Sequence, residues 1–270
     1  MSYRRIVGLM TDRDEAALDA RRLVPRLLRG IENTDTQAEV AGLTLEAPIL
    51  GVAADPPGKP VVAPLMVPSD LLLEYPHLYD APQCVALLRI DSMGVLIRHV
   101  RSLAGAGVAA VALDQSVLAL SPPYGNQPWR PRSREELSEL RAAAGVPFWL
   151  YGVGGADDAD VALEAGLEAV VVDSLPGRHI GGPAVIEVLP EILDAVAGTM
   201  GVFAAGTVRD GIDVFRLLAV GADLVIHTGE RPVNTLAAEL QYAMRLTGCA
   251  SLSEIGFDAV FAPLFEEGRA

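Results

Sequence analysis

Four polar side chains near the ends of aliphatic runs are the first candidates for chemistry. Asp173 lies near the end of the run at 169–174, and His227 lies near the end of the run at 224–228. Arg178 and His179 come shortly after Asp173. A carboxylate, a guanidinium group and imidazole rings are sufficient for acid/base work on an anionic metabolite. The histidines show no HxH or HExxH spacing, so no metal site is predicted.

Lysine chemistry is excluded by the composition. Lys59 is the only lysine among 21 basic residues, and it lies in a stretch rich in proline and glycine rather than on a strand that would desolvate it. Schiff-base formation needs a desolvated lysine amine. An aldolase-type reaction is therefore not expected.

The net charge and the cysteines limit the partners and the cellular compartment that we expect for the protein. The formal net charge of -14 repels phosphate backbones and anionic lipid, so neither nucleic acid nor a membrane is expected as a partner. No apolar run reaches the roughly 18 residues of a membrane span, and the first residues turn acidic too early for a signal peptide. Cys84 and Cys249 show neither zinc nor disulfide spacing. The sequence predicts a cytoplasmic protein.

Alternating runs predict the elements that position these side chains. Hydrophobic residues make up 51% of the 270 residues and aromatic residues only 5%, which is typical of helices packed on buried strands. Strands are expected at 84–90, 108–114, 148–153, 169–174, 202–206 and 224–228. Helices are expected at 92–105, 133–144, 156–165, 183–197, 209–220 and 232–246. This rhythm indicates a parallel sheet.

Two earlier runs, at 49–54 and 61–65, complete the eight strands of a TIM (β/α)8 barrel, and a short helix is expected at 71–79. The first two strands are closer in sequence than a right-handed crossover normally allows. We therefore expect a barrel that is irregular or incomplete around its first β/α unit.

A single domain over 1–270 is predicted. Its parts are a helix and hairpin lead-in at 1–46, the barrel at 47–247 and a tail at 248–270. A Pro-rich segment at 120–132 would lie at the catalytic end of the barrel.

Three motifs, in order and at the right separations, carry a family resemblance. They are PRLLRGI at 25–31, IEVLPEI at 186–192 and VRDGIDV at 208–214. The chain resembles the FMN-dependent α-hydroxy-acid dehydrogenases and oxidases, which include glycolate oxidase and lactate oxidase. The resemblance covers most of 21–252. It implies a TIM barrel in which a histidine base, carboxylate-binding arginines and a flavin together oxidise a 2-hydroxy acid.

The resemblance also locates the catalytic base. In the family the base lies in a Ser-Asn-His-Gly-Gly-Arg motif after the sixth strand, and the ungapped match here is Asp-Ser-Leu-Pro-Gly-Arg at 173–178. Leu175 then stands at the base position, where it cannot accept a proton, and Arg178 matches the carboxylate-binding arginine. A paired insertion and deletion would instead bring His179 to the base position, with Asp173 as its catalytic companion.

On the flavin-ring side, the family's lysine corresponds to Tyr151, which supplies no positive charge. On the phosphate side, Gly206, Thr207 and Arg209 match the family's phosphate-binding turn. FMN binding therefore stays an open alternative. The residues expected around the flavin ring would bind it more weakly than in the family, while part of the phosphate-binding turn is kept.

The family also has a Gly-Arg pair after the eighth strand. Gly229 and Arg231 correspond to it if the loop has grown. An ion pair on the surface of an acidic protein explains Arg209 and Arg231 equally well.

Three functions remain open. The first is a family member with a degraded flavin site, which binds a small anionic metabolite or a partner through Tyr151, Arg178 and His227. The second is a working FMN-dependent oxidoreductase of altered type, and the third is a non-redox acid/base enzyme. Because a missing first helix would expose apolar faces, we also expect a homo-oligomer or a heteromer with a full-length relative.

Overall fold

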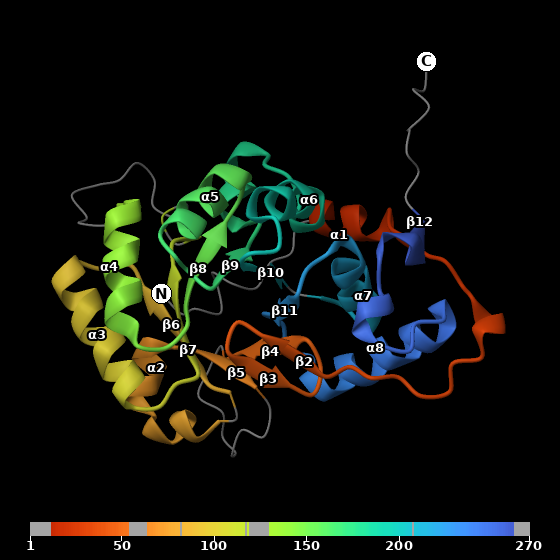
Figure 1. The fold of residues 1–270 in the computed structure, drawn as a ribbon, viewed down its shortest axis with the longest axis horizontal. Coiled ribbons are helices and arrows are strands. Elements are labelled where there is room, and N and C mark those ends of the chain that lie inside the picture. Colours follow the sequence, from red (N-terminus) through yellow and green to blue (C-terminus); the bar gives the residue numbers. More distant parts are fainter. Residues whose placement is uncertain are drawn as a thin grey trace.

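Eight parallel strands close into a barrel (Figure 1). The computed structural model describes residues 12–53, 64–81, 83–116, 118, 130–206 and 208–261. Pairing of the last strand with the first completes the ring and confirms the predicted TIM barrel. In chain order the strands are β4 (Ile49–Val52), β5 (Leu65–Pro68), β6 (Val85–Arg89), β7 (Ala110–Asp114), β8 (Phe148–Val153), β9 (Ala169–Val172), β10 (Gly201–Gly206) and β11 (Leu224–His227).

Helices surround the barrel, as Figure 1 shows. Their ends follow local signals, since the Ser133 side chain caps one helix through a capping box and the Asp210 side chain caps another. In chain order they are α2 (Ser69–Glu74), α3 (Met93–Gly105), α4 (Arg134–Ala144), α5 (Ala156–Glu164), α6 (Val185–Val196), α7 (Gly211–Val220) and α8 (Val233–Thr247). Within the described ranges, no helix has both the length and the apolar character to cross a membrane.

The first β/α unit differs from the others. β4 and β5 pair directly in parallel, with Gly51 opposite Leu65. Most of their connection, at 54–63 and including Lys59, lies outside the described residues. Of the second strand expected at 61–65, residues 61–63 lie outside the described residues, and the described strand, Leu65–Pro68, continues past the expected end. The reason is that Met66 and Val67 are the residues that pair with β6 and are fully buried.

Short elements before and after the barrel close its sides. Helix α1 (Asp12–Asp19) packs against α6 and α7. The hairpin of β2 (Ala38–Val40) and β3 (Leu43–Leu45) buries its two leucines against the barrel interior. Strand β1 (Arg22–Leu23) pairs with β12 (Val260–Phe261), which joins the two ends of the described chain. The remaining 3-10 turns are η2 (Leu27–Arg29), η3 (Pro76–Asp80), η6 (Leu175–Ile180), η7 (Leu252–Glu254) and η8 (Phe257–Ala259).

The barrel interior is filled by side chains. Trp149 and Phe203 meet edge to face with ring centroids 4.9 Å apart, and both are fully buried. Tyr151, on the same strand as Trp149, lies in the same interior cluster. A filled barrel has no channel, so a ligand site has to form at the carboxyl ends of the strands.

Helices α7 and α8 touch at a glycine. A Cβ placed on Gly211 would lie 2.2 Å from the backbone nitrogen of Leu240 and 2.4 Å from the carbonyl carbon of Glu239. Both of these are backbone atoms, which cannot rotate away as a flexible side chain can. The absence of a side chain at Gly211 therefore sets the distance between the two helices.

We predict that Gly211→Ala lowers the free energy of unfolding by roughly 2 to 3 kcal/mol, because the helices must separate to admit a methyl group. Guanidinium denaturation would measure the change. Gly105→Ala is the matched control, since a Cβ at Gly105 meets nothing within 4 Å at the end of α3. It should leave stability equal or raise it by up to about 1 kcal/mol. Equal denaturation midpoints for the two variants would contradict the prediction.

Candidate functional site

Polar residues cover the carboxyl end of the barrel interior. The interior cluster contains alternate residues of three neighbouring strands, namely Ala110 and Ala112, Trp149 and Tyr151, and Ala169 and Val171. Side chains alternate along a strand, so the next inward positions are Asp114 and Asp173. These two carboxylates flank Tyr151, which brings two of the predicted site residues, Tyr151 and Asp173, together.

Tyr151 is buried, with 1% of its surface exposed. Burial first, and then the negative charges of Asp173 and Asp114, raise the pKa of Tyr151 well above its ordinary value. The phenol therefore stays protonated at neutral pH. Its Oη is buried, and a hydrogen bond with the Asp173 carboxylate also acts to raise this pKa. The group at this position is a neutral hydrogen-bond donor and carries no positive charge.

The strand bends directly after Tyr151. Gly152 has φ +93°, and a Cβ there would lie 2.6 Å from the backbone nitrogen of Ser116. Asp114 holds this neighbouring turn in place, because its Oδ1 accepts hydrogen bonds from Ser116 N at 2.8 Å and Ser116 Oγ at 2.6 Å. The close approach between β7 and β8 fixes the position of the phenol.

The turn after β9 presents an apolar side chain at the expected base position. Leu175 is 2% exposed and begins η6. Its backbone N–H donates to Asp173 Oδ1 at 3.0 Å, so this carboxylate takes part in the turn. The backbone of Arg178 and His179 continues η6, while their side chains lie outside the description. The geometry thus places leucine directly after the sixth strand.

His227 lies on the other side of the barrel wall. Leu224 and Ile226 belong to the interior cluster and Val225 to the outer core, so alternation along β11 points His227 outward. The residue is 1% exposed, and neither ring nitrogen has a well-formed hydrogen bond in the described chain. Burial, with a smaller effect of the Arg231 charge, lowers the pKa of His227 to about 4. The structure does not bring His227 together with Tyr151.

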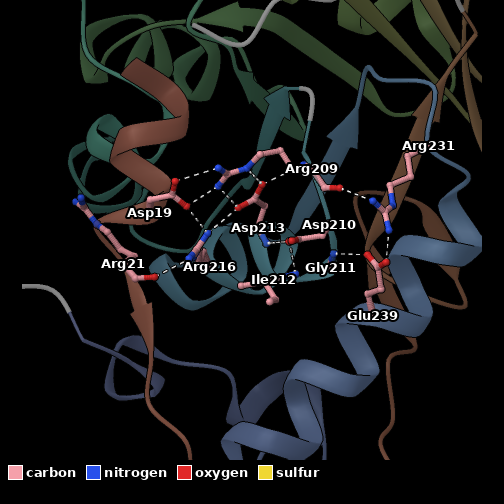
Figure 2. Close-up of polar contacts among 10 residues, drawn as sticks. All are labelled: Asp19, Arg21, Arg209, Asp210, Gly211, Ile212, Asp213, Arg216, Arg231 and Glu239. Carbon is pink, nitrogen blue, oxygen red and sulfur yellow. Dashed lines mark hydrogen bonds and ion pairs between the residues drawn. The ribbon is translucent and has the colours of Figure 1, made fainter. Parts of the chain in front are cut away.

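Arg209, after β10, is bonded to two carboxylates of its own chain (Figure 2). Its Nε donates to Asp213 Oδ2 at 2.8 Å and its Nη2 to Asp213 Oδ1 at 2.9 Å. On the other side, Nη1 donates to Asp19 Oδ2 at 3.0 Å and Nη2 to Asp19 Oδ1 at 2.7 Å. The hydrogen bonds to Asp213 and Asp19 raise the pKa of Arg209. All three guanidinium nitrogens therefore have an acidic partner.

A second arginine reinforces this cluster. Arg216 Nη1 donates to Asp213 Oδ1 at 2.8 Å and to Asp19 Oδ1 at 3.2 Å, and its Nε donates to the carbonyl oxygen of Arg21 at 2.9 Å. Burial of Asp213 acts to raise the pKa of its carboxyl group, but the hydrogen bonds from Arg209 and Arg216 outweigh burial and lower it. Asp213 therefore stays ionised between two arginines.

The first backbone N–H groups of α7 also have carboxylate acceptors within the chain (Figure 2). Gly211 N–H donates to Glu239 Oε2 at 2.9 Å. The next two amides donate to Asp210 Oδ1 at 2.9 and 3.0 Å. Arg231 pairs with Glu239 and donates from Nη1 to the carbonyl oxygen of Arg209 at 2.9 Å. The structure thus brings Arg209 and Arg231 together, but acids of the chain itself hold their donors.

The two glycines predicted to line the phosphate site lie at a strand end and in a turn. Gly206 is the last residue of β10, and Gly229 lies in the turn after β11. Thr207 lies outside the described residues. No group of three or more His, Cys, Asp or Glu among the described residues is placed to hold a metal ion.

Sequence reasoning did not include the acids that hold the two arginines. Asp213 had a local signal, since it stands four residues after Arg209 in a helical segment. Asp19 and Glu239 had none, because they reach Arg209 and Arg231 from other helices. Asp114 was not predicted as a site residue.

The closed ring of eight parallel strands with surrounding helices defines a TIM-barrel protein. The family model for FMN-dependent dehydrogenases matches residues 108–262. The chain belongs to the FMN-dependent dehydrogenase family, which confirms the resemblance.

The curated relatives include hydroxy-acid oxidases and L-lactate dehydrogenases. L-lactate oxidase from Lactobacillus jensenii is 34% identical over 135 residues, which cover 44% of this chain and 33% of that protein. 2-Hydroxyacid oxidase 1 from Homo sapiens is 36% identical over 138 residues, covering 46% of this chain and 37% of that protein. The matched region therefore spans little more than a third of the length of these relatives.

Solved structures share the whole fold. A crystal structure of mandelate oxidase with (S)-2-phenylpropionate has a TM-score of 0.76 at 23% identity and covers 97% of this chain and 93% of that chain. A putative lactate oxidase from Pediococcus acidilactici has a TM-score of 0.76 at 18% identity and covers 98% of this chain and 90% of that chain. Another mandelate oxidase structure contains a monooxide FMN adduct.

We predict that His227 makes the protein less stable in mild acid. The pKa of His227 is about 4 in the folded chain, whereas an unperturbed histidine has a pKa of 6.5. The unfolded state therefore takes up the proton first as the pH falls. The stability held by the neutral ring is complete above pH 6.5 and decreases by about 3 kcal/mol down to pH 4.

Urea denaturation of the wild type and of His227→Gln at several pH values would measure this effect. Between pH 7 and pH 4, the unfolding free energy of the wild type should decrease by about 3 kcal/mol more than that of His227→Gln. His77→Gln is the control, because His77 is exposed. A difference that is constant with pH would contradict the prediction.

Proposed function

We propose that this member of the FMN-dependent dehydrogenase family no longer oxidises 2-hydroxy acids and instead binds a small anionic metabolite at the carboxyl end of its barrel. The buried Leu175 in the turn after β9 carries the proposal. The family's reaction needs a side chain there that accepts the α-hydroxyl proton, and a leucine side chain has no basic atom.

The residues at the flavin position do not fit the flavin. Tyr151 is neutral where the ring would need a cation beside its reduced, anionic form. Asp114 and Asp173 add negative charge on either side of that phenol, which further disfavours an anionic ring. At the phosphate end, the donors of Arg209 and Arg231 are bonded to Asp213, Asp19 and Glu239. A flavin phosphate would have to displace these carboxylates.

Arg178 is our candidate for holding the anion. It corresponds to the family's carboxylate-binding arginine, and η6 holds its backbone at the carboxyl end of the barrel. This turn is tightly closed, because Gly182 N–H donates to the carbonyl oxygen of Gly177 at 2.8 Å and a Cβ on Gly182 would lie 2.7 Å from Gly177 Cα. A closed turn after β9 suits bidentate binding of a carboxylate by Arg178.

The flavin part of the proposal predicts colourless protein. Purified protein should lack absorbance in the visible flavin bands. When FMN is titrated with protein to high micromolar concentration, its fluorescence should stay that of free flavin. A relative such as the human 2-hydroxyacid oxidase 1 serves as the positive control. A yellow preparation that bleaches with a 2-hydroxy acid would overturn the proposal in favour of a working FMN-dependent oxidoreductase.

The binding part predicts affinity for short carboxylates. Glycolate, lactate and pyruvate, tested by calorimetry, should include at least one ligand of the wild type. Arg178→Gln should weaken that ligand about tenfold to a hundredfold, as expected for one lost charge-assisted contact. Arg101→Gln on the exposed face of α3 is the control and should bind like the wild type. No binding, or equal binding by both variants, would contradict the assignment.

A further inference from the structure

We infer that a hollow at the amino end of the barrel is a second ligand site, which binds an aliphatic amine between apolar walls and the carboxylates of Asp223 and Glu39. Three segments surround this hollow of about 370 Å³, namely the β2–β3 hairpin, the turn between α7 and β11, and η7 with the residue that follows it. The inference goes beyond the proposed function, because the carboxylate site proposed above lies at the other end of the strands.

The chain order places all three segments at the amino end. Asp223 directly precedes β11, which begins at Leu224. The hairpin leads into the start of β4, and η7 follows α8, which runs back from the carboxyl ends of the strands to their amino ends. Catalytic sites of TIM barrels lie at the carboxyl ends, so this hollow is separate from the site after β9.

The carboxylate of Asp223 is held in a fixed position. Its Oδ2 accepts a hydrogen bond from Val202 N at 2.9 Å, and its own backbone N–H donates to the carbonyl oxygen of Val202 at 2.9 Å. Oδ1 has no hydrogen-bond partner among the residues that the structure describes. One oxygen of a positioned carboxylate is therefore left for a ligand.

The charges around the hollow favour a cation. Burial raises the pKa of the Asp223 carboxyl group, the hydrogen bond from Val202 opposes this rise, and no basic side chain contributes to it. Glu39 is exposed and has no ion pair within the described ranges. None of the described residues that line the hollow is basic. A bound cation would supply the compensating charge that the chain does not place there.

Most of the remaining wall is apolar. Leu218, Ala222 and Ile255 are buried, and Val40 and Leu252 are partly buried beside them. Small-molecule sites of roughly 300 to 1,000 Å³ combine such walls with a few polar groups that orient the ligand. At neutral pH an aliphatic amine is a cation with a hydrocarbon chain. Its two parts match the carboxylates and the apolar wall.

Contacts within the chain position the walls in advance. Asp35 N–H donates to the carbonyl oxygen of Ala250 at 2.8 Å, and Asp35 forms a parallel β-bridge with Ser251. Thr36 Oγ1 donates to the carbonyl oxygen of Glu46 at 2.8 Å, across the base of the hairpin. The hairpin and the segment of η7 are thus joined beside the hollow, which reduces the entropy that a ligand has to overcome.

Titration with hexylamine, hexan-1-ol and hexanoate, followed in 1H–15N NMR spectra, tests the inference. These three compounds have equal chain length and differ in the charge of the head group. Hexylamine should shift the amide resonances of 38–40, 221–223 and 252–255 and bind at least about tenfold more tightly than hexan-1-ol, while hexanoate should leave these resonances unchanged.

Butylamine tests the apolar wall. It should bind about tenfold more weakly than hexylamine, because two fewer methylene groups enter the hollow. Equal affinity for hexylamine and hexan-1-ol, or hexylamine shifts confined to other parts of the chain, would overturn the inference.

Two variants test the carboxylates. Asp223→Asn keeps an oxygen for Val202 N–H but removes the charge, and it should weaken hexylamine binding about tenfold without changing hexan-1-ol binding. Glu39→Gln should also weaken hexylamine, and it leaves the contact with Val202 intact. Glu139→Gln, on the exposed face of α4 across the barrel from α7 (Figure 1), is the control and should bind like the wild type.

Wild-type affinity for hexylamine in both Asp223→Asn and Glu39→Gln would contradict the assignment. Arg178→Gln, which tests the proposed function, should bind hexylamine like the wild type. Failure of this inference is therefore distinct from failure of the proposed function.

Discussion

The buried carboxylate of Asp213 between Arg209 and Arg216 is the interaction on which the arrangement of this end of the barrel depends. With 1% of its side chain exposed, an ionised aspartate is stable only if hydrogen-bonded cations replace the lost water. The two guanidinium groups supply this replacement and are thereby fixed in direction. Arg209 is then aimed at Asp19, so α1 is connected to the loop after β10. A single buried charge thus links α7, that loop and α1.

The packing of the barrel interior favours uncharged side chains, whatever chemistry the site performs. The barrel is stabilised by its interior, and a neutral phenol such as Tyr151 packs beside Trp149 and Phe203 as part of that interior. A lysine at this position would need an anion to compensate its charge in the same surroundings. A neutral aromatic ring at this position therefore suits the packing of the barrel. Family membership and retained activity are different questions for this chain.

Arginines at the carboxyl ends of β10 and β11 need anionic partners. In this chain acids on neighbouring elements satisfy them: Asp19 on α1 holds Arg209, and Glu239 on α8 holds Arg231 and the first amide of α7. Each acid gives the arginines what a bound anion would give them, without a ligand. These carboxylates thus connect α1, α7 and α8 to the loops at the carboxyl ends of β10 and β11.

The sequence by itself determined the barrel, most of its strands and helices, and the family, because hydrophobic alternation, helix capping and short motifs are local and survive in one dimension. The family resemblance also located Leu175 and Tyr151, because motif matches need only the order of residues along the chain. Only the tertiary structure decided that Asp19 reaches Arg209, and that His227 points away from the interior. Contacts between distant segments depend on how the helices pack around the barrel, and the face of a strand that a border residue occupies depends on the register of the closed sheet.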